Sequence, residues 1–192
     1  LVHVRDPSTG RFVEADRLVS PDPIEGGVFG LSIAWDGRQL LVSEFRRGLS
    51  LLRYSGRIYV YERTGPTDFA LVQEITSPTF TERSGVSRIL DLEDGQLALL
   101  DRSPIESPPS YFVIQTYQRD DASGRWVHVG SLLDPEIPRQ ADGASEAAFT
   151  DSSLITSSAR SSLAATQQGR AFAYDLSVLH AIGRRYCAPT GG

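Results

Sequence analysis

Self-similarity at an interval of about 57 residues is the feature that most limits the fold of this sequence, because a fixed interval is the signature of repeat proteins. The phrases "LVSP", "EITSP" and "SLLDP" end at Pro21, Pro78 and Pro135, which are equally spaced. Three further landmarks keep this interval to within one residue. Four independent landmarks with one interval predict a repeat protein. The further landmarks are the aromatic residues Phe12, Phe69 and Trp126, the turn residues Asp36, Asp94 and Asp151, and the strand residues Val60, Tyr117 and Tyr174.

Each period contains four strand signals. The segments 29–35 ("FGLSIAW") and 38–43 ("RQLLVS") flank an Asp-Gly pair, which favours the positive φ angles of a tight hairpin turn. The segments 57–62 ("RIYVYE") and 69–76 ("FALVQEIT") are rich in β-branched and aromatic residues. The stretch "ASEAAF" at 144–149 has helical propensity, but the period places it on the first strand of a repeat, so we expect a strand there.

Four antiparallel strands in a period of this length describe one blade of a β-propeller. The predicted fold class is all-β: an arc of four-stranded antiparallel blades that belongs to a larger ring. A Greek-key sandwich is the alternative all-β fold, but it does not require a regular period. The predicted units are two strands of a partial blade at 1–20, complete blades at 21–78 and 79–135, three strands of a partial blade at 136–178, and a tail or the start of a next module at 179–192.

The composition limits the classes of function. The net charge of −5 argues against nucleic acid or an anionic membrane surface as the partner, and no apolar stretch is long enough to cross a membrane. The chain has no Lys, Asn or Met, and this bias is typical of a GC-rich bacterial genome. A chain without Met is expected to be a processed product or a fragment. The single Cys187 has no neighbouring His at ligand spacing and is not expected to bind a metal.

The landmarks resemble the FG-GAP repeat of integrin α-chain propellers and its bacterial relatives. That motif runs from Phe-Gly through an Asp-containing turn and a Gly-x-Val-Tyr-Val-Phe strand to an aromatic residue and a closing proline. The resemblance implies a β-propeller in an extracellular or cell-surface bacterial protein, with a role in binding or adhesion and with further blades of the same chain as neighbours. Blade 21–78 carries it with Phe29-Gly30, Asp36-Gly37, residues 56–61, Phe69 and Pro78.

Integrin-type blades often bind calcium between their first two strands, but the sequence departs from that pattern. Calcium needs some six to eight oxygen ligands, whereas "AWDGRQL" and "FTDSSL" offer one carboxylate each and "LEDGQL" offers two adjacent ones. Calcium binding is therefore disfavoured, and we predict no cofactor and interpret Asp36, Asp94 and Asp151 as turn residues. No serine lies in a Gly-x-Ser-x-Gly elbow and the three histidines lack ligand spacing, so no catalytic or metal residues are predicted and an enzyme is disfavoured.

Long connections between the second and third strands of each blade are the candidate binding elements. They emerge on one face of the predicted propeller at 44–55, 102–110 and 159–168, and long loops on a rigid scaffold are where binding residues concentrate. The first, "EFRRGLSLLRYS", combines apolar residues with arginines, a composition suited to protein or glycan contact. Its leucines are equally compatible with a plug over the blade. The predicted binding residues are Phe45, Arg46, Arg47, Leu49, Arg53 and Tyr54.

The aromatic landmarks admit two interpretations. A ligand-binding row is one, but their position at the start of the outermost strand favours packing between adjacent blades. The predicted function is accordingly a non-enzymatic binding or adhesion scaffold that recognises a protein or glycan. Two alternatives remain open: a structural spacer in a large surface protein, and part of an enzyme whose active site lies on blades absent from this sequence.

Overall fold

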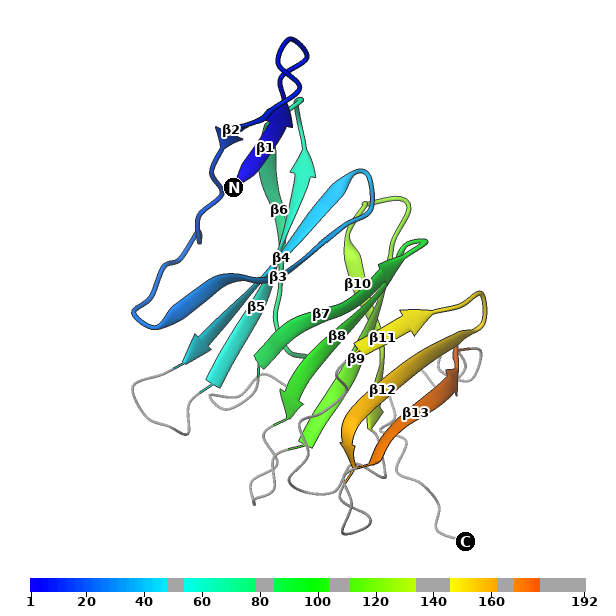
Figure 1. The fold of residues 1–192 in the computed structure, drawn as a ribbon. Coiled ribbons are helices and arrows are strands. Elements are labelled where there is room, and N and C mark those ends of the chain that lie inside the picture. The colour runs from blue at the N-terminus through cyan, green and yellow to red at the C-terminus, as the bar shows by residue number, and fades with distance from the viewer. Residues whose placement is uncertain (48–53, 79–84, 104–110, 134–145, 162–167, 177–192) are drawn as a thin grey trace, which may run out of the picture.

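A computed structural model describes residues 1–47, 54–78, 85–103, 111–133, 146–161 and 168–176 (Figure 1). Within these ranges the chain is all-β, with thirteen strands, and contains no helix long and apolar enough to cross a membrane. The strands are β1 (Val2–Arg5), β2 (Phe12–Asp16), β3 (Gly27–Trp35), β4 (Gln39–Arg47), β5 (Tyr54–Arg63), β6 (Phe69–Ile75), β7 (Gly85–Glu93), β8 (Gln96–Ser103), β9 (Tyr111–Arg119), β10 (Trp126–Leu133), β11 (Glu146–Phe149), β12 (Ser153–Ser161) and β13 (Gln168–Asp175).

The strands form four antiparallel sheets in chain order. The first sheet is the hairpin β1–β2, the second contains β3 to β6, the third contains β7 to β10, and the fourth contains β11 to β13. Every hydrogen-bonded neighbour is also the neighbour in sequence, and the sheets follow one another across the molecule (Figure 1). The predicted all-β class and its four-stranded antiparallel sheets are confirmed.

Only the second of the two Asp-Gly turns has the predicted two residues with positive φ, because the first turn spans residues 36–38 and Asp36 does not adopt positive φ. Asp94 and Gly95 both adopt positive φ, at 46° and 73°, in the two-residue turn between β7 and β8. In the turn between β3 and β4, Gly37 has φ of 94° and the Asp36 carboxylate accepts hydrogen bonds from two backbone N–H groups. The residues "ASEAAF" contain β11, so the period predicted this segment correctly against its helical propensity.

Three apolar clusters hold the sheets together. The second and third sheets share the largest cluster of buried side chains, which includes Trp126. The third and fourth sheets share another cluster, and a smaller one on the other face of the second sheet includes Leu18, from the segment after β2. Buried in the largest cluster are Leu41, Ile58, Val60, Ile75, Val86, Ile89, Leu97, Leu99, Tyr117 and Trp126.

Gly56, part of the FG-GAP-like motif, marks a close approach between the second and third sheets. A Cβ atom placed on Gly56 would lie 2.0 Å from the backbone carbonyl oxygen of Val86, closer than any side chain tolerates. Gly56 is buried on β5 and Val86 on β7, so the backbones of the two sheets meet here directly. Glycine is therefore required at this position by the packing of the sheets.

Strand pairing corrects one of the sequence landmarks. Tyr117 lies opposite Leu97, and Tyr174 lies opposite Leu154. The corresponding pair in the second sheet is Leu40 with Tyr61, one residue beyond the Val60 that the interval selected. The segment from β4 to β5 is one residue longer than its counterpart, and a shift of one residue turns a side chain to the other face of a sheet. Burial raises the pKa of Tyr61 to about 12 and raises that of Tyr117 as well.

The three aromatic landmarks have different surroundings. Trp126 packs between the second and third sheets and is 3% exposed, as predicted. Phe69 is partly buried against the cluster that faces the first sheet, with its ring edge-on to Trp35 at 6.0 Å. Phe12 is 72% exposed, so packing between sheets is wrong for this residue. Phe12 pairs with Arg5 on β1, and this first sheet has only two strands in the described chain.

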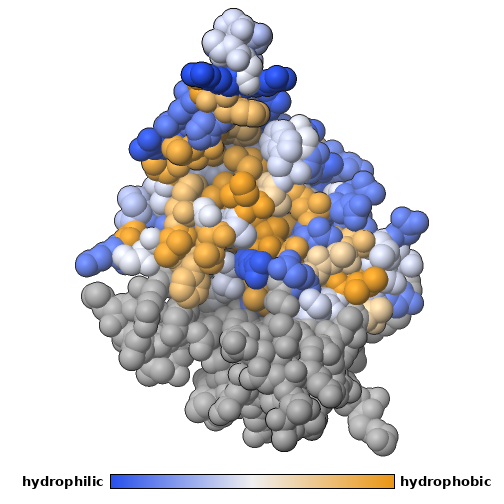
Figure 2. All heavy atoms as spheres, in the orientation of Figure 1, coloured by the Kyte–Doolittle hydropathy of each residue, from blue (hydrophilic) through white to orange (hydrophobic). Residues whose placement is uncertain are grey.

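Exposed apolar residues gather on the second sheet near the first hairpin. Ile33 and Trp35 on β3 are 68% and 44% exposed, and Leu71 on β6 is 45% exposed. Ile33 pairs with Val42 and Trp35 with Leu40, so these side chains lie on the sheet face that points away from the third sheet. Figure 2 shows apolar residues on the visible surface below this hairpin.

Candidate binding rim

The connections of the sheets fall on two opposite edges. Antiparallel pairing puts the ends of β4, β8 and β12 beside the starts of β5, β9 and β13, and we call this side the loop edge (Figure 1). The tight turns, such as β3 to β4 and β9 to β10, lie on the other side, which we call the turn edge. The predicted binding residues belong to the loop edge.

The strands extend further into the predicted binding loop than the sequence indicated. Residues 44–47 belong to β4 and residues 54–55 to β5, with Phe45 opposite Gly56 and Arg47 opposite Tyr54. The connection therefore contains only residues 48–53 instead of 44–55. Of the predicted binding residues, Phe45, Arg46, Arg47 and Tyr54 lie on these strand ends, whereas Leu49 and Arg53 lie outside the described residues.

A buried carboxyl group anchors the base of this connection. Glu44 is 1% exposed and accepts hydrogen bonds from the Ser20 hydroxyl at 2.8 Å and from the Tyr59 hydroxyl at 3.0 Å. Tyr59 is itself buried, and its ring contacts that of Phe29. Since Ser20 precedes Pro21 in the segment that leads to β3, one carboxyl group ties two connections of the loop edge together. Buried polar groups need such partners, because an unsatisfied one is costly.

The third sheet repeats this arrangement at the interval of the sequence repeat. Ser77, which precedes Pro78, donates its hydroxyl hydrogen to Asp101 Oδ2 at 2.5 Å. Ser77 and Asp101 follow Ser20 and Glu44 by one repeat interval each, and both are buried. The proline landmark of the sequence thus follows a serine that hydrogen-bonds to the next sheet. Composition alone could not reveal this, because serines are frequent in the chain.

A series of hydrogen-bonded side chains extends from Asp101 toward the surface. Gln115 is 1% exposed and donates its amide N–H to Asp101 Oδ2 at 3.0 Å. The Gln115 amide oxygen accepts from the Ser131 hydroxyl at 2.5 Å and lies 2.8 Å from His128 Nε2. Burial lowers the pKa of His128, which favours its neutral form. Sequence alone does not indicate the contact between His128 and Gln115, because Gln115 lies 13 residues away on the neighbouring strand.

The described surface beside the anchor combines apolar and charged groups. Ile24 and Val28 are 39% and 48% exposed, and Val28 lies opposite Phe45 of the predicted binding set. On β5 of the same sheet, Arg57 Nη1 lies 2.5 Å from Glu74 and 4.0 Å from Asp22. Such a mixture suits protein or glycan contact.

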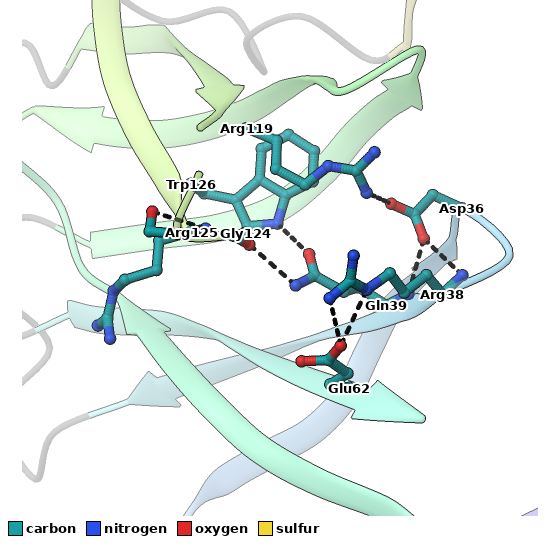
Figure 3. A network of polar contacts seen from close by, with 9 residues as sticks. Asp36, Arg38, Gln39, Glu62, Arg119, Gly124, Arg125 and Trp126 are labelled. Carbon is teal, nitrogen blue, oxygen red and sulfur yellow. Dashed lines mark hydrogen bonds and ion pairs between the residues drawn. The ribbon is translucent and has the colours of Figure 1, made fainter. Parts of the chain in front are cut away.

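The turn edge carries a different inter-sheet network (Figure 3). The Trp126 indole N–H donates to Gln39 Oε1 at 3.0 Å, and the Gln39 amide donates to the Gly124 carbonyl at 3.0 Å. Arg119 Nη1 contacts the Asp36 carboxylate at 2.5 Å, and its guanidinium lies 5.9 Å from the Trp126 ring centroid. We call Asp36, Gln39, Arg119 and Trp126 the clasp, because they join the second sheet to the third.

Two turns on this edge share one hydrogen-bond pattern. In "DPSTGR" and "DDASGR", Asp6 and Asp120 each accept from the backbone N–H two residues on and from a hydroxyl three residues on. The bonds from Ser8 and Thr9 lower the pKa of Asp6 to about 2, and those from Ser123 and Ala122 lower that of Asp120. The acidic pair at 120–121 therefore lies in an exposed turn.

In the part of the chain that the structure describes, no three His, Cys, Asp or Glu side chains are close enough to hold a metal ion together. Comparison with known proteins gives no match to a family model, to a curated protein or to a solved structure.

Proposed function

We propose that the chain is part of an FG-GAP-type β-propeller that serves as a non-enzymatic binding or adhesion scaffold. In this proposal the four sheets are blades of one ring, completed by further blades of the same chain, in an extracellular or cell-surface bacterial protein. The loop edge forms the binding rim and contacts a protein or a glycan. No cofactor takes part.

The observation that carries this proposal is the pair of buried anchors at the loop edge. Glu44 and Asp101 each fix the base of two connections through a serine 24 residues earlier in the chain. Rigid bases reduce the entropy that loops lose when they bind a partner. The buried carboxyl groups on this edge support a binding role, because they hold the connections between strands in a defined geometry.

The proposal is tested by replacing residues 48–53 with a Gly-Ser segment of equal length. The matched control replaces the turn residues 64–67 on the turn edge in the same way. The unmodified chain and both variants are applied to immobilised glycan and protein arrays, and their folding is compared by thermal melting. We expect the first replacement to abolish array binding and the control to retain it. Binding that survives the first replacement, or a folded unmodified chain that binds nothing, contradicts the proposal.

A further inference from the structure

The edge strand β10 contains a bulge that brings two polar side chains to the same face of the third sheet. Its register against β9 shifts between His128 and Gly130, so one extra residue is inserted there. In a regular strand, side chains three residues apart point to opposite faces. Because of the bulge, His128 and Ser131 both reach the amide oxygen of Gln115, at 2.8 Å and 2.5 Å.

The His128 imidazole is held from two sides. Its Nε2 lies 2.8 Å from Gln115 Oε1, and the ring packs edge-on to that of Tyr117, with the ring centroids 5.2 Å apart. The Gln115 amide nitrogen donates to Asp101, so the amide oxygen faces the imidazole and Nε2 must carry the hydrogen. Neutral His128 is therefore a donor that holds the Gln115 amide against the Asp101 carboxyl group.

The second sheet has the same framework without a histidine. It carries Leu71 at the position of His128, since each of these residues pairs with a tyrosine of the neighbouring strand. It carries Tyr59 at the position of Gln115, and the Tyr59 hydroxyl donates directly to Glu44. Of the described strands in these two sheets, only those of the third place a group that titrates near neutral pH beside the anchor.

The surroundings of His128 favour the neutral form of its ring. Burial lowers the pKa of His128, although the Gly130 carbonyl acts in the opposite direction. The folded chain therefore binds a proton at this ring less tightly than the unfolded chain does. The resulting stability is fully present above the unfolded pKa of about 6.5, and it is lost as the pH falls through that value toward the lowered pKa of the folded chain.

Few charged groups of the described strands surround the imidazole. β10 carries none besides His128 itself. On β8, Asp101 lies behind Gln115, and on β9 the Tyr117 phenol stays protonated because burial raises its pKa. The charged residues of β6 and β9 are paired with other strands: Glu74 with Arg57, and Arg119 with Asp36.

We propose that His128 is a pH-sensitive switch on the Asp101 anchor of the third sheet. The neutral ring donates to Gln115 and keeps the anchor closed. When the ring takes up a proton from the solvent, the charged imidazolium turns outward from the exposed edge strand, and Gln115 loses one of its two donors. The anchor then loosens at the end of β8, while the anchor of the second sheet stays closed. The proposal does not depend on the binding function of the loop edge.

Nuclear magnetic resonance of the full chain from about pH 8 to about pH 5 tests the proposal. We expect the His128 ring to titrate with a pKa below about 6.5, and the side-chain amide resonances of Gln115 to follow the same curve. Hydrogen-exchange protection factors should fall with that midpoint at the end of β8 but not at the end of β4. Titration of His128 at or above its ordinary pKa, Gln115 resonances that do not follow it, or an equal loss of protection at both strand ends overturns the proposal.

The substitution His128→Leu provides the matched test, because Leu71 shows that this position of the sheet accepts a leucine. We expect it to abolish the pH dependence of protection at the end of β8. His3→Leu is the control, since His3 is exposed on β1 of the first hairpin, and this variant should keep the pH dependence. A folded His128→Leu chain whose β8 protection still falls with pH overturns the proposal. If this variant does not fold, the titration of the unmodified chain decides between the same two results.

Discussion

The two faces of the second sheet differ sharply in how they are covered. Toward the third sheet, Leu41, Ile58 and Val60 are fully buried, and the clasp adds polar contacts at the turn edge. Toward the first hairpin, Ile33 remains 68% exposed and Trp35 44%. Both faces belong to one sheet with similar apolar content, so the neighbour, rather than the sheet, decides how much burial stabilises the fold.

This difference shows which interface of the second sheet contributes more to the stability of the chain. The four-stranded third sheet shares the largest buried cluster with the second sheet, and Trp126 belongs to it. In contrast, no described residue of β1 or β2 belongs to the cluster on the other face of the second sheet. Substitutions at the interface of the second and third sheets should therefore destabilise the chain far more than equivalent substitutions at the first hairpin. The following predictions test this asymmetry.

The largest effect is expected for Trp126→Ala. Loss of a buried Trp leaves a cavity and typically costs about 3–5 kcal/mol, and this variant also leaves the Gln39 amide oxygen without its indole donor. The matched variant Phe12→Ala removes an aromatic residue at the equivalent landmark that is 72% exposed, so its effect should be small. Urea unfolding measures the free energy of unfolding of both variants. Similar losses of unfolding free energy in Trp126→Ala and Phe12→Ala would contradict the asymmetry.

A smaller effect is expected for Ser77→Ala. The substitution removes a hydroxyl donor from Asp101, which is fully buried, and should cost about 1–3 kcal/mol. Ser20→Ala removes the equivalent donor from Glu44, but Ser20 is only half-buried, so water can replace its hydroxyl. The free energy of unfolding should therefore fall less for Ser20→Ala. An equal or larger loss for Ser20→Ala contradicts this ranking.

The smallest effect concerns the Asp6 turn. Hydrogen bonds lower the pKa of Asp6 from 3.8 to about 2, so ionised Asp6 favours the folded turn. This contribution is complete above the unfolded pKa and is lost as the pH falls through the folded pKa. NMR titration of the Asp6 carboxyl should show the lowered pKa, and Thr9→Ala should raise it. A pKa that Thr9→Ala leaves unchanged contradicts the role of the Thr9 hydroxyl.

Much of the fold was predictable because strand periodicity and turn residues are local signals. The segments 29–35 and 69–76 fall on β3 and β6 within two residues at each end. The register of β5 was not predictable. One extra residue between β4 and β5 makes Tyr61, rather than Val60, the counterpart of Tyr117. Periodicity alone cannot locate such an insertion within a connection.

The contacts between sheets were the least predictable part. Gln39 and Trp126 are 87 residues apart, and no local pattern connects them. The anchors at Glu44 and Asp101 share a fixed spacing to Ser20 and Ser77, which is a readable signal once the proline interval is known. Of the predicted binding set, the strand positions of Phe45 and Tyr54 could be described, while the ligand stays a prediction.

The central claim is that the second and third sheets face each other and are joined by the clasp. A double-mutant cycle between Gln39→Leu and Trp126→Phe tests it most directly, because the second substitution keeps a ring but removes the indole N–H. We predict a coupling free energy of roughly 0.5–3 kcal/mol between these positions, and none between Gln39→Leu and Val127→Ala. Independent, additive effects of Gln39→Leu and Trp126→Phe would contradict the claim.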